Sequence, residues 1–156
     1  MMKRILIFLS FGTILTLSLT NCSNTTNCNQ STYVVMTVGF HTVKNDSIIT
    51  TTMDSVWVKG VGIDSILYNN TKSVSQLSLP LQENKSVSRF VIRNNATYDT
   101  LTCYHTNIKQ FISLECGCEI NFQLDSVKTT NHLIKSVQIV QKNVTNQSIE
   151  NIQIFF

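Results

Sequence analysis

Alternating hydrophobic and polar residues recur along most of the chain, and this two-residue period predicts β-strands. One face of residues 33–41 carries four apolar side chains, Val34, Met36, Val38 and Phe40. The longest run covers residues 112–124, in which seven apolar positions alternate with six polar or small ones. Such a run predicts a half-buried strand that is bent or bulged at Gly117.

Polar turn segments divide the rest of the chain into further short strands, which are rich in the Thr, Val and Ile that favour pleated sheets. We predict them at residues 47–60, 63–68, 76–81, 86–93, 99–106, 137–139 and 152–156. The turns are rich in Asn and Asp and lie at residues 44–46, 68–71, 94–95 and 130–131. About eight short strands without helical periodicity predict an all-β fold, an antiparallel β-sandwich over residues 32–156.

The N-terminal residues have the pattern of an export signal. Lys3 and Arg4 precede a mostly apolar run over residues 5–19, which is short for a membrane-spanning helix. We therefore predict that residues 1–21 are a signal peptide that is cleaved. Secretion with cleavage at a nearby position and an uncleaved anchor are the alternatives.

The end of this run predicts a lipid anchor. Residues 19–22 read Leu-Thr-Asn-Cys and resemble the lipobox of bacterial lipoproteins, in which the Cys thiol is lipidated. We expect Cys22 to carry the lipid and residues 22–31 to form the lipidated end and a short tether. Two or more acyl chains hold a protein durably on a membrane. Ser23 follows Cys22 in place of Asp, which by resemblance to known sorting patterns favours the outer membrane, facing the periplasm.

Composition and charge narrow the class of protein. The chain of 156 residues suffices for one domain, and 42% apolar residues with 13% charged ones exclude a disordered chain. Of the 12 Lys and Arg residues, two lie in the predicted signal peptide, which leaves 10 basic residues against 9 acidic ones. Nucleic-acid-binding proteins usually carry a clear basic excess, so nucleic acid is not an expected partner.

The number of cysteines fits an exported protein, in which disulfides persist. Assigning Cys22 to the lipid leaves Cys28, Cys103, Cys116 and Cys118. Cys116 and Cys118 flank one Gly and would point the same way on a strand, so a bridge between these two would be strained. Two pairings stay open: Cys28–Cys116 with Cys103–Cys118, or Cys28–Cys118 with Cys103–Cys116.

A metal site is the alternative use of these side chains, with Cys116, Cys118, His105 and His132 as ligands. The sequence lacks the Cys-x-x-Cys spacing of zinc sites, and oxidising conditions compete for the thiols, so we predict no metal and no cofactor. The sequence also lacks a complete phosphate-binding glycine motif, a GxSxG motif and an HExxH motif. We therefore predict no catalytic residues.

Four other residues have structural interpretations. Trp57 lies between two valines and is expected in the core, whereas Glu119 is expected on a solvated outer face. His105 is expected at a strand end or in a loop. Asp99, which precedes Thr100, is expected to form an Asx-turn at a strand end.

Several short segments together resemble a family of small, uncharacterised lipoproteins of the Bacteroidetes, classed as a domain of unknown function. These segments are Cys22, Cys28, residues 77–81, residues 99–104, residues 113–117 and the C-terminal end rich in Ile and Val. The resemblance implies an envelope location, a β-rich fold and no known activity. It also favours the pairing of Cys28 with Cys116, and it leaves Cys103 and Cys118 at positions where the family pattern has no Cys.

These observations predict a non-catalytic interaction module. Its lipid would hold it on the membrane, and its partner would be another envelope protein or a glycan. The alternative is a small-ligand carrier or an enzyme with a pocket at one end of the sandwich.

Overall fold

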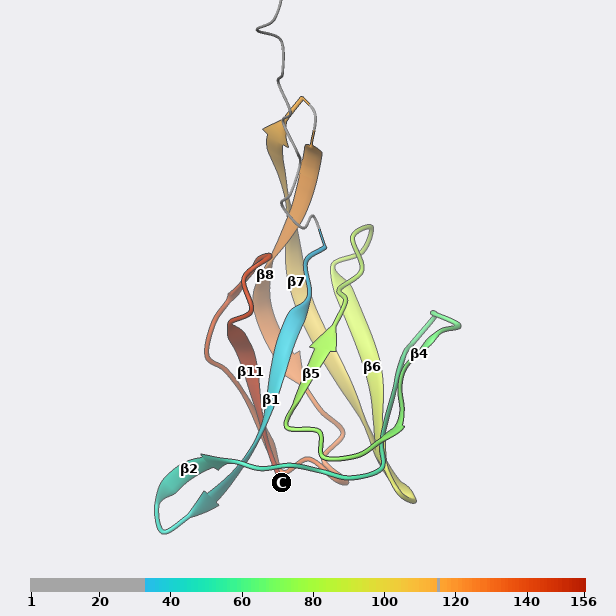
Figure 1. The fold of residues 1–156 in the computed structure, drawn as a ribbon, viewed down its shortest axis with the longest axis vertical. Helices are drawn as coiled ribbons and strands as arrows, with labels where there is room; N and C mark the ends of the chain where they lie inside the picture. The colour runs from blue at the N-terminus through green and yellow to red at the C-terminus, as the bar shows by residue number, and fades with distance from the viewer. Residues whose placement is uncertain (1–32, 115) are drawn as a thin grey trace, which may run out of the picture.

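The computed structural model describes residues 33–114 and 116–156, which form eleven strands in two curled sheets (Figure 1). No helix is present among these residues, so the prediction of an all-β fold is confirmed. The strands are β1 (Met36–Lys44), β2 (Ser47–Thr50), β3 (Val56–Gly60), β4 (Ile66–Thr71), β5 (Gln76–Leu79), β6 (Val87–Asn94), β7 (Thr97–Ser113), β8 (Gly117–Lys128), β9 (Ser136–Ile139), β10 (Asn143–Val144) and β11 (Glu150–Phe155).

The first sheet has the order β2-β1-β11-β9, and β5 also pairs with β1. Strand β1 is antiparallel to β2 and β5 but parallel to β11, with Val38 opposite Ile152. The sheets are therefore not wholly antiparallel as predicted. The parallel pair joins the first and last strands of the described region, and parallel strands require a long connection of this kind.

The second sheet has the order β10-β8-β7-β6-β3-β4, and its strand pairs are antiparallel. Strand β7 is its longest element and pairs with β6 from Thr97 to Tyr104 and with β8 from Thr102 to its end at Ser113. Beyond the last pairs with β6 and β10, β7 and β8 continue as a two-stranded arm that projects from one end of the molecule (Figure 1).

The hydrophobic core is built from the alternating apolar positions of both sheets, as the sequence pattern predicts. Its fully buried side chains include Met36, Val38, Phe40, Leu77, Leu79, Ile152 and Ile154 from the first sheet and Val56, Val58, Ile92 and Leu101 from the second. Burial of each such side chain contributes about 1.5–3 kcal/mol before conformational entropy is subtracted. The core therefore provides the rigid frame on which the loops described below are mounted.

Two predicted strands are each divided in the structure. The run over residues 112–124 is not one bent strand, because β7 ends at Ser113 and β8 begins at Gly117. Gly117 has a φ of 72°, which favours glycine, and the register of the two strands shifts at this point. The run over residues 47–60 is likewise split into β2 and β3, and Ser55 between them has a φ of 59°.

Within residues 33–114 and 116–156, no helix is long and apolar enough to cross a membrane. The predicted signal peptide over residues 1–21 and the tether over residues 22–31 lie outside the described residues.

Candidate functional site

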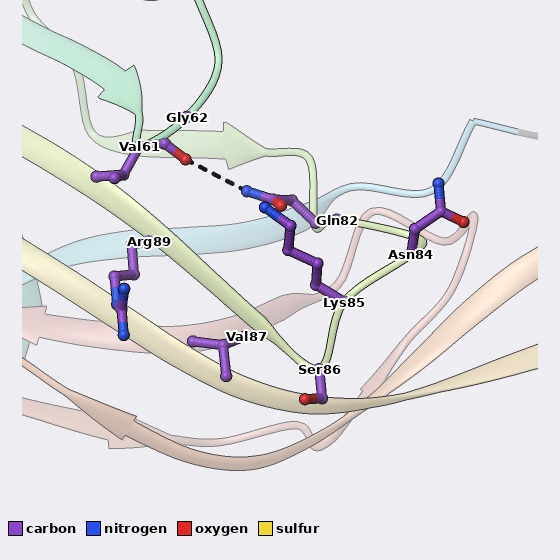
Figure 2. Close-up of a pocket in the computed structure, with 8 residues that line it drawn as sticks. All are labelled: Val61, Gly62, Gln82, Asn84, Lys85, Ser86, Val87 and Arg89. Atoms are coloured by element: carbon purple, nitrogen blue, oxygen red, sulfur yellow. Dashed lines mark hydrogen bonds between the residues drawn. The ribbon is translucent and has the colours of Figure 1, made fainter.

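An open cleft of about 560 Å³ lies where the segment after β3 approaches the loop that joins β5 to β6 (Figure 2). One wall is the turn at Val61 and Gly62, and this turn is fixed because the Val61 N–H donates to the Arg89 carbonyl of β6 at 2.8 Å. The other wall is the segment 82–87, which we call the 82–87 loop. The Gln82 side-chain amide reaches across and donates to the Val61 carbonyl at 3.4 Å.

The lining of this cleft is polar and positively charged. It contains the cations Lys85 and Arg89, the side-chain amides of Gln82 and Asn84, and the Ser86 hydroxyl. The described residues that line the cleft include no acidic side chain. Such a lining offers hydrogen-bond donors and two positive charges to an anionic group, and guanidinium groups bind carboxylates and phosphates especially well.

A network of buried side chains holds the 82–87 loop in place. Ser88 is fully buried on β6, and its hydroxyl accepts the Gln82 N–H at 2.8 Å and lies 2.8 Å from Nε2 of His105. The other ring nitrogen of His105, Nδ1, lies 2.7 Å from Oδ1 of Asn107. The imidazole of His105 thus links Ser88 on β6 to Asn107 on β7.

Asn107 completes the network by binding the loop backbone. Its side-chain amide donates to the carbonyls of Glu83 at 2.6 Å and Lys85 at 2.9 Å, and the Gln82 carbonyl lies at 3.3 Å. A loop whose carbonyls accept from one rigid side chain has few alternative conformations. The network therefore presents Lys85 and its neighbours to the cleft in a defined geometry.

The hydrogen bonds of this network require a proton on Nδ1 of His105, and burial favours the neutral imidazole. Oδ1 of Asn107 can only accept, so Nδ1 must donate, and Nε2 is then free to accept the Ser88 hydroxyl proton. Burial lowers the pKa of His105, against the opposing effects of the Asn107 hydrogen bond and the charge of Asp125. His105 is in mid-strand on β7 and is buried, so the prediction of a strand end or a loop is wrong.

The arrangement of Ser88, His105 and Asn107 has the connectivity of a catalytic triad, but it is not placed for catalysis. Ser88 has no exposed surface, and its hydroxyl is already occupied by the Gln82 N–H. A nucleophile has to reach a substrate carbonyl in the open. The three side chains therefore act on the loop and not on a substrate.

Asp99 forms a second buried network on the same face of β7. Its carboxylate accepts the backbone N–H groups of His132 at 2.8 Å, Leu133 at 2.6 Å and Ile134 at 2.7 Å, and the Thr130 hydroxyl at 2.5 Å. Burial alone would raise the pKa of Asp99, but these hydrogen bonds stabilise the anion and hold the pKa well below its usual range. The prediction of a local Asx-turn is wrong, because the partners lie more than thirty residues away.

The cysteine predictions have different outcomes. Cys103 is buried on β7 and Cys118 is exposed on β8, and both are free thiols. Cys118 pairs with Phe111, eight residues beyond Cys103 on β7, which is about 26 Å at the rise of an antiparallel strand. The predicted Cys103–Cys118 bridge is therefore wrong. The alternative pairing, Cys28–Cys118 with Cys103–Cys116, is wrong for the same reason, because it also requires both thiols to be bonded. Cys22 and Cys28 lie outside the described residues, so the lipidation of Cys22 and the pairing of Cys28 stay predictions.

The ligands of the alternative metal site are not brought together. His105 is bonded to Ser88 and Asn107, whereas Nδ1 of His132 lies 3.1 Å from Asp99, at the other end of the same face of β7. Across residues 33–114 and 116–156, no group of three or more His, Cys, Asp or Glu residues is placed to hold a metal ion.

Two further predictions, on the burial of Trp57 and of Glu119, are wrong. Trp57 is only partly buried and lies outside the core cluster, where the Arg93 guanidinium stacks 4.8 Å from its ring centroid. Glu119 is buried and accepts from the Asn146 amide at 3.3 Å. Residues 112–124 form parts of two strands and not one, and the turn before Gly117 changes which residues of β8 face the interior.

Comparison with known protein families gives one match. The family model of DUF6452, a family of unknown function, matches residues 55–156. The chain belongs to the DUF6452 family. The match includes residues 77–81, 99–104 and 113–117, which suggested a domain of unknown function from the sequence, and it begins after Cys22 and Cys28. Neither the curated proteins nor the solved structures contain a match to the chain. In this DUF6452 chain, the cleft and the network behind it both lie within the matched region.

Proposed function

We propose that this DUF6452 protein is a non-catalytic, lipid-anchored protein of a bacterial cell envelope that binds acidic groups of an envelope glycan in its cleft. The anchor is Cys22, at the outer membrane and facing the periplasm. The resemblance of residues 19–22 to a lipobox, and of the chain to Bacteroidetes lipoproteins, supports this location. The cleft supports the binding activity.

The observation that carries the binding proposal is the pair of cations in a cleft whose wall is held rigid. Lys85 and Arg89 share the cleft with amide and hydroxyl groups, which are the groups that bind sugar hydroxyls, and no acidic side chain in the lining neutralises them. Because Asn107 and Ser88 already fix the 82–87 loop, a ligand does not have to order it on binding.

The binding test compares an acidic oligosaccharide with a neutral one. Titration calorimetry with a hexuronic-acid tetrasaccharide should give saturable binding that weakens with salt, and a neutral glucose tetrasaccharide should give none. The K85Q/R89Q variant removes both charges and should weaken the acidic ligand by about tenfold or more.

The control is R93Q, which removes one positive charge from the strand of Arg89 but outside the cleft. It should bind the acidic tetrasaccharide as the wild-type protein does. Equal affinities of the wild-type protein and the K85Q/R89Q variant would contradict the proposal, because the cleft would then not be the binding site.

The anchor is tested separately through Cys22. The Cys22→Ala variant should lose labelling by a fatty acid and accumulate as uncleaved or mislocalised protein, because the thiol that carries the lipid is gone. If this variant is still labelled and fractionates with membranes as before, the lipobox interpretation is wrong.

The proposal also pairs Cys28 with Cys116, as the family resemblance favours. Cys103 and Cys118 are free thiols, and Cys116 is not among the free cysteines. Cys116 lies in the turn at the tip of the β7–β8 arm, so this bridge would attach the N-terminal tether to the arm.

A further inference from the structure

The β7–β8 arm is an unsupported part of the second sheet. We define the arm as residues 107–113 of β7 and 117–121 of β8 with the turn between them. Strand β6 pairs with β7 only as far as Tyr104, and β10 pairs with β8 only at Phe122 and Gln123. In the described part of the chain the arm therefore has no neighbouring strand on either edge, and Figure 1 shows it projecting from one end of the molecule.

Large apolar side chains are exposed along this arm. Leu114 at the turn is 90% exposed, Phe111 is 62% exposed, and Ile108 is 45% exposed. A two-stranded ribbon is marginally stable in water on its own, and exposed apolar patches of soluble proteins usually mark surfaces that contact a partner or a membrane. The tip of the arm therefore needs an apolar environment to cover it.

The path of the chain indicates that this environment is a lipid bilayer. Residue 33, where the described chain starts, leads into β1 at the end of the molecule from which the arm projects (Figure 1). The Thr37 N–H of β1 donates to the Asn151 side chain of β11. In the loop that precedes β11, the Asn146 amide donates to Glu119 at the base of the arm. The chain that precedes residue 33, with the proposed anchor Cys22, therefore joins the folded part beside the arm.

The reach of this segment limits how far the arm can be from the membrane. Ten residues lie between Cys22 and residue 33, so the eleven steps from one to the other span at most about 40 Å of extended chain. With the proposed Cys28–Cys116 bridge, only five residues lie between the lipidated residue and Cys28, and the six steps from Cys22 to Cys28 span at most about 22 Å. The exposed Phe111 and Leu114 are then held within reach of the bilayer surface.

We propose that the tip of the β7–β8 arm inserts Phe111 and Leu114 into the bilayer leaflet that holds the acyl chains of Cys22. This inference rests on the lipid anchor of the proposed function. Apolar and aromatic side chains at such a tip would lie at the boundary between headgroups and acyl chains. Asn107, at the base of the arm, holds the 82–87 loop, so the inserted arm would place the cleft about 20 Å above the membrane, the length of six strand residues.

The test is a depth measurement on the full lipidated protein. The chain has one Trp, so the Trp57→Phe background leaves no other indole. In this background, F111W reports from the tip, and I48W reports from the β1–β2 hairpin. Ile48 is a matched control because it is 54% exposed on a hairpin at the opposite end of the molecule (Figure 1). Both variants are reconstituted in phosphatidylethanolamine–phosphatidylglycerol vesicles that contain phosphatidylcholine brominated on its acyl chains.

We expect the brominated lipid to reduce the fluorescence of F111W by about twofold or more and to leave that of I48W unchanged, because bromine quenches only by contact within the bilayer. Equal fluorescence of F111W with and without bromine would overturn the proposal. In that case, protection of F111W from aqueous acrylamide would show that residues 23–32 or a second copy covers the tip. Fatty-acid labelling and flotation of the same samples separate the two proposals. A labelled, floating protein with an unquenched F111W refutes only the insertion of the arm. An unlabelled protein refutes both the lipidation of Cys22 and the insertion of the arm.

Discussion

The buried stretch of β7, from Asp99 to His105, has a polar inward side chain at each of its ends and apolar ones between them. Asp99 and His105 are both buried, with the fully buried Leu101 and Cys103 in the middle. Each polar residue holds a distant loop against the sheet, and the two do so by different chemistry. Asp99 is an ionised acceptor that collects donors from residues 130–134, whereas His105 is a neutral link in a chain of donors and acceptors.

This difference predicts which end of β7 is more firmly held. Hydrogen bonds to a charged group are about twice as strong as those between neutral groups. The Asp99 network also uses backbone N–H groups, which no substitution of a single neighbour removes. The His105 network is broken by the loss of any one of its side chains, Ser88, His105 or Asn107. This weaker network is the one that holds the 82–87 loop, which forms a wall of the cleft.

The largest effect is expected for Asp99→Asn. The amide removes the charge and turns an NH2 group toward backbone N–H donors, so that buried donors lose their acceptor. We expect a loss of about 3 kcal/mol or more in the free energy of unfolding. Urea denaturation followed by circular dichroism measures this loss.

The control for this variant is Asp125→Asn on β8. Asp125 is exposed and accepts one long bond from the Thr106 hydroxyl, at 3.3 Å, so its substitution should change the unfolding free energy by less than about 0.5 kcal/mol. If D99N and D125N were equally stable, the hydrogen bonds of Asp99 would stabilise the fold no more than the single bond of Asp125 does.

A smaller effect is expected for Asn107→Ala. This substitution removes the donors to the Glu83 and Lys85 carbonyls and leaves the Nδ1 proton of His105 without an acceptor. We expect a loss of about 2 kcal/mol and faster hydrogen exchange that is confined to the neighbourhood of the 82–87 loop. Faster exchange at residues 130–134 in the same variant would show that the two networks open as one cooperative unit. It would contradict the inference that the Asp99 and His105 networks differ in stability.

The two networks should also respond to different ranges of pH. Burial lowers the pKa of His105, so between its unfolded pKa of about 6.5 and its lower folded pKa the unfolded chain binds a proton that the folded chain does not. The free energy of unfolding should therefore fall as the pH is lowered through 6.5. Asp99, whose pKa is lowered, contributes stability above 3.8, and this contribution is lost only as the pH falls below that value.

Urea denaturation at several pH values between 8 and 5 separates the two contributions. The His105→Gln variant cannot titrate at this position, so its stability should fall less between pH 7 and pH 5 than that of the wild-type protein. An unchanged slope in H105Q would mean that His105 is not responsible for the pH dependence in this range.

The same face of β7 shows what the sequence could predict and what it could not. The two-residue period correctly predicted strands around most of the core, because burial of alternate side chains is a local property of the chain. It did not predict that Asp99 and His105 share the buried face, although both fall on the alternation that Leu101 and Cys103 define. Their partners lie far away in sequence, so the signal was an unexplained polar residue at an apolar position.

The cleft and the arm were missed for related reasons. The loop that forms the cleft wall is fixed by Ser88 and Asn107 on two other strands, and no local pattern marks these two residues as its partners. The sequence predicts one continuous strand at the tip of the arm, because the alternation of apolar and polar residues continues through the hairpin turn. The single glycine at position 117 was the available signal, and it was interpreted as a bulge instead of a turn.

The last prediction concerns Cys103, which lies between the two networks and reports on both. Burial raises the pKa of its thiol to about 12, so the thiolate needed for reaction is absent at neutral pH, and the side chain is inaccessible. A thiol reagent should modify the exposed Cys118 first and Cys103 only when β7 opens, and peptide mapping by mass spectrometry follows each site.

If opening requires release of the Asp99 end, D99N should speed the labelling of Cys103 by about a hundredfold, at tenfold for each 1.4 kcal/mol lost. N107A should speed it less, because the weaker network contributes less to closure. The reverse order would show that the His105 end governs the opening, and equal labelling of Cys103 and Cys118 in the wild-type protein would show that this face is not closed.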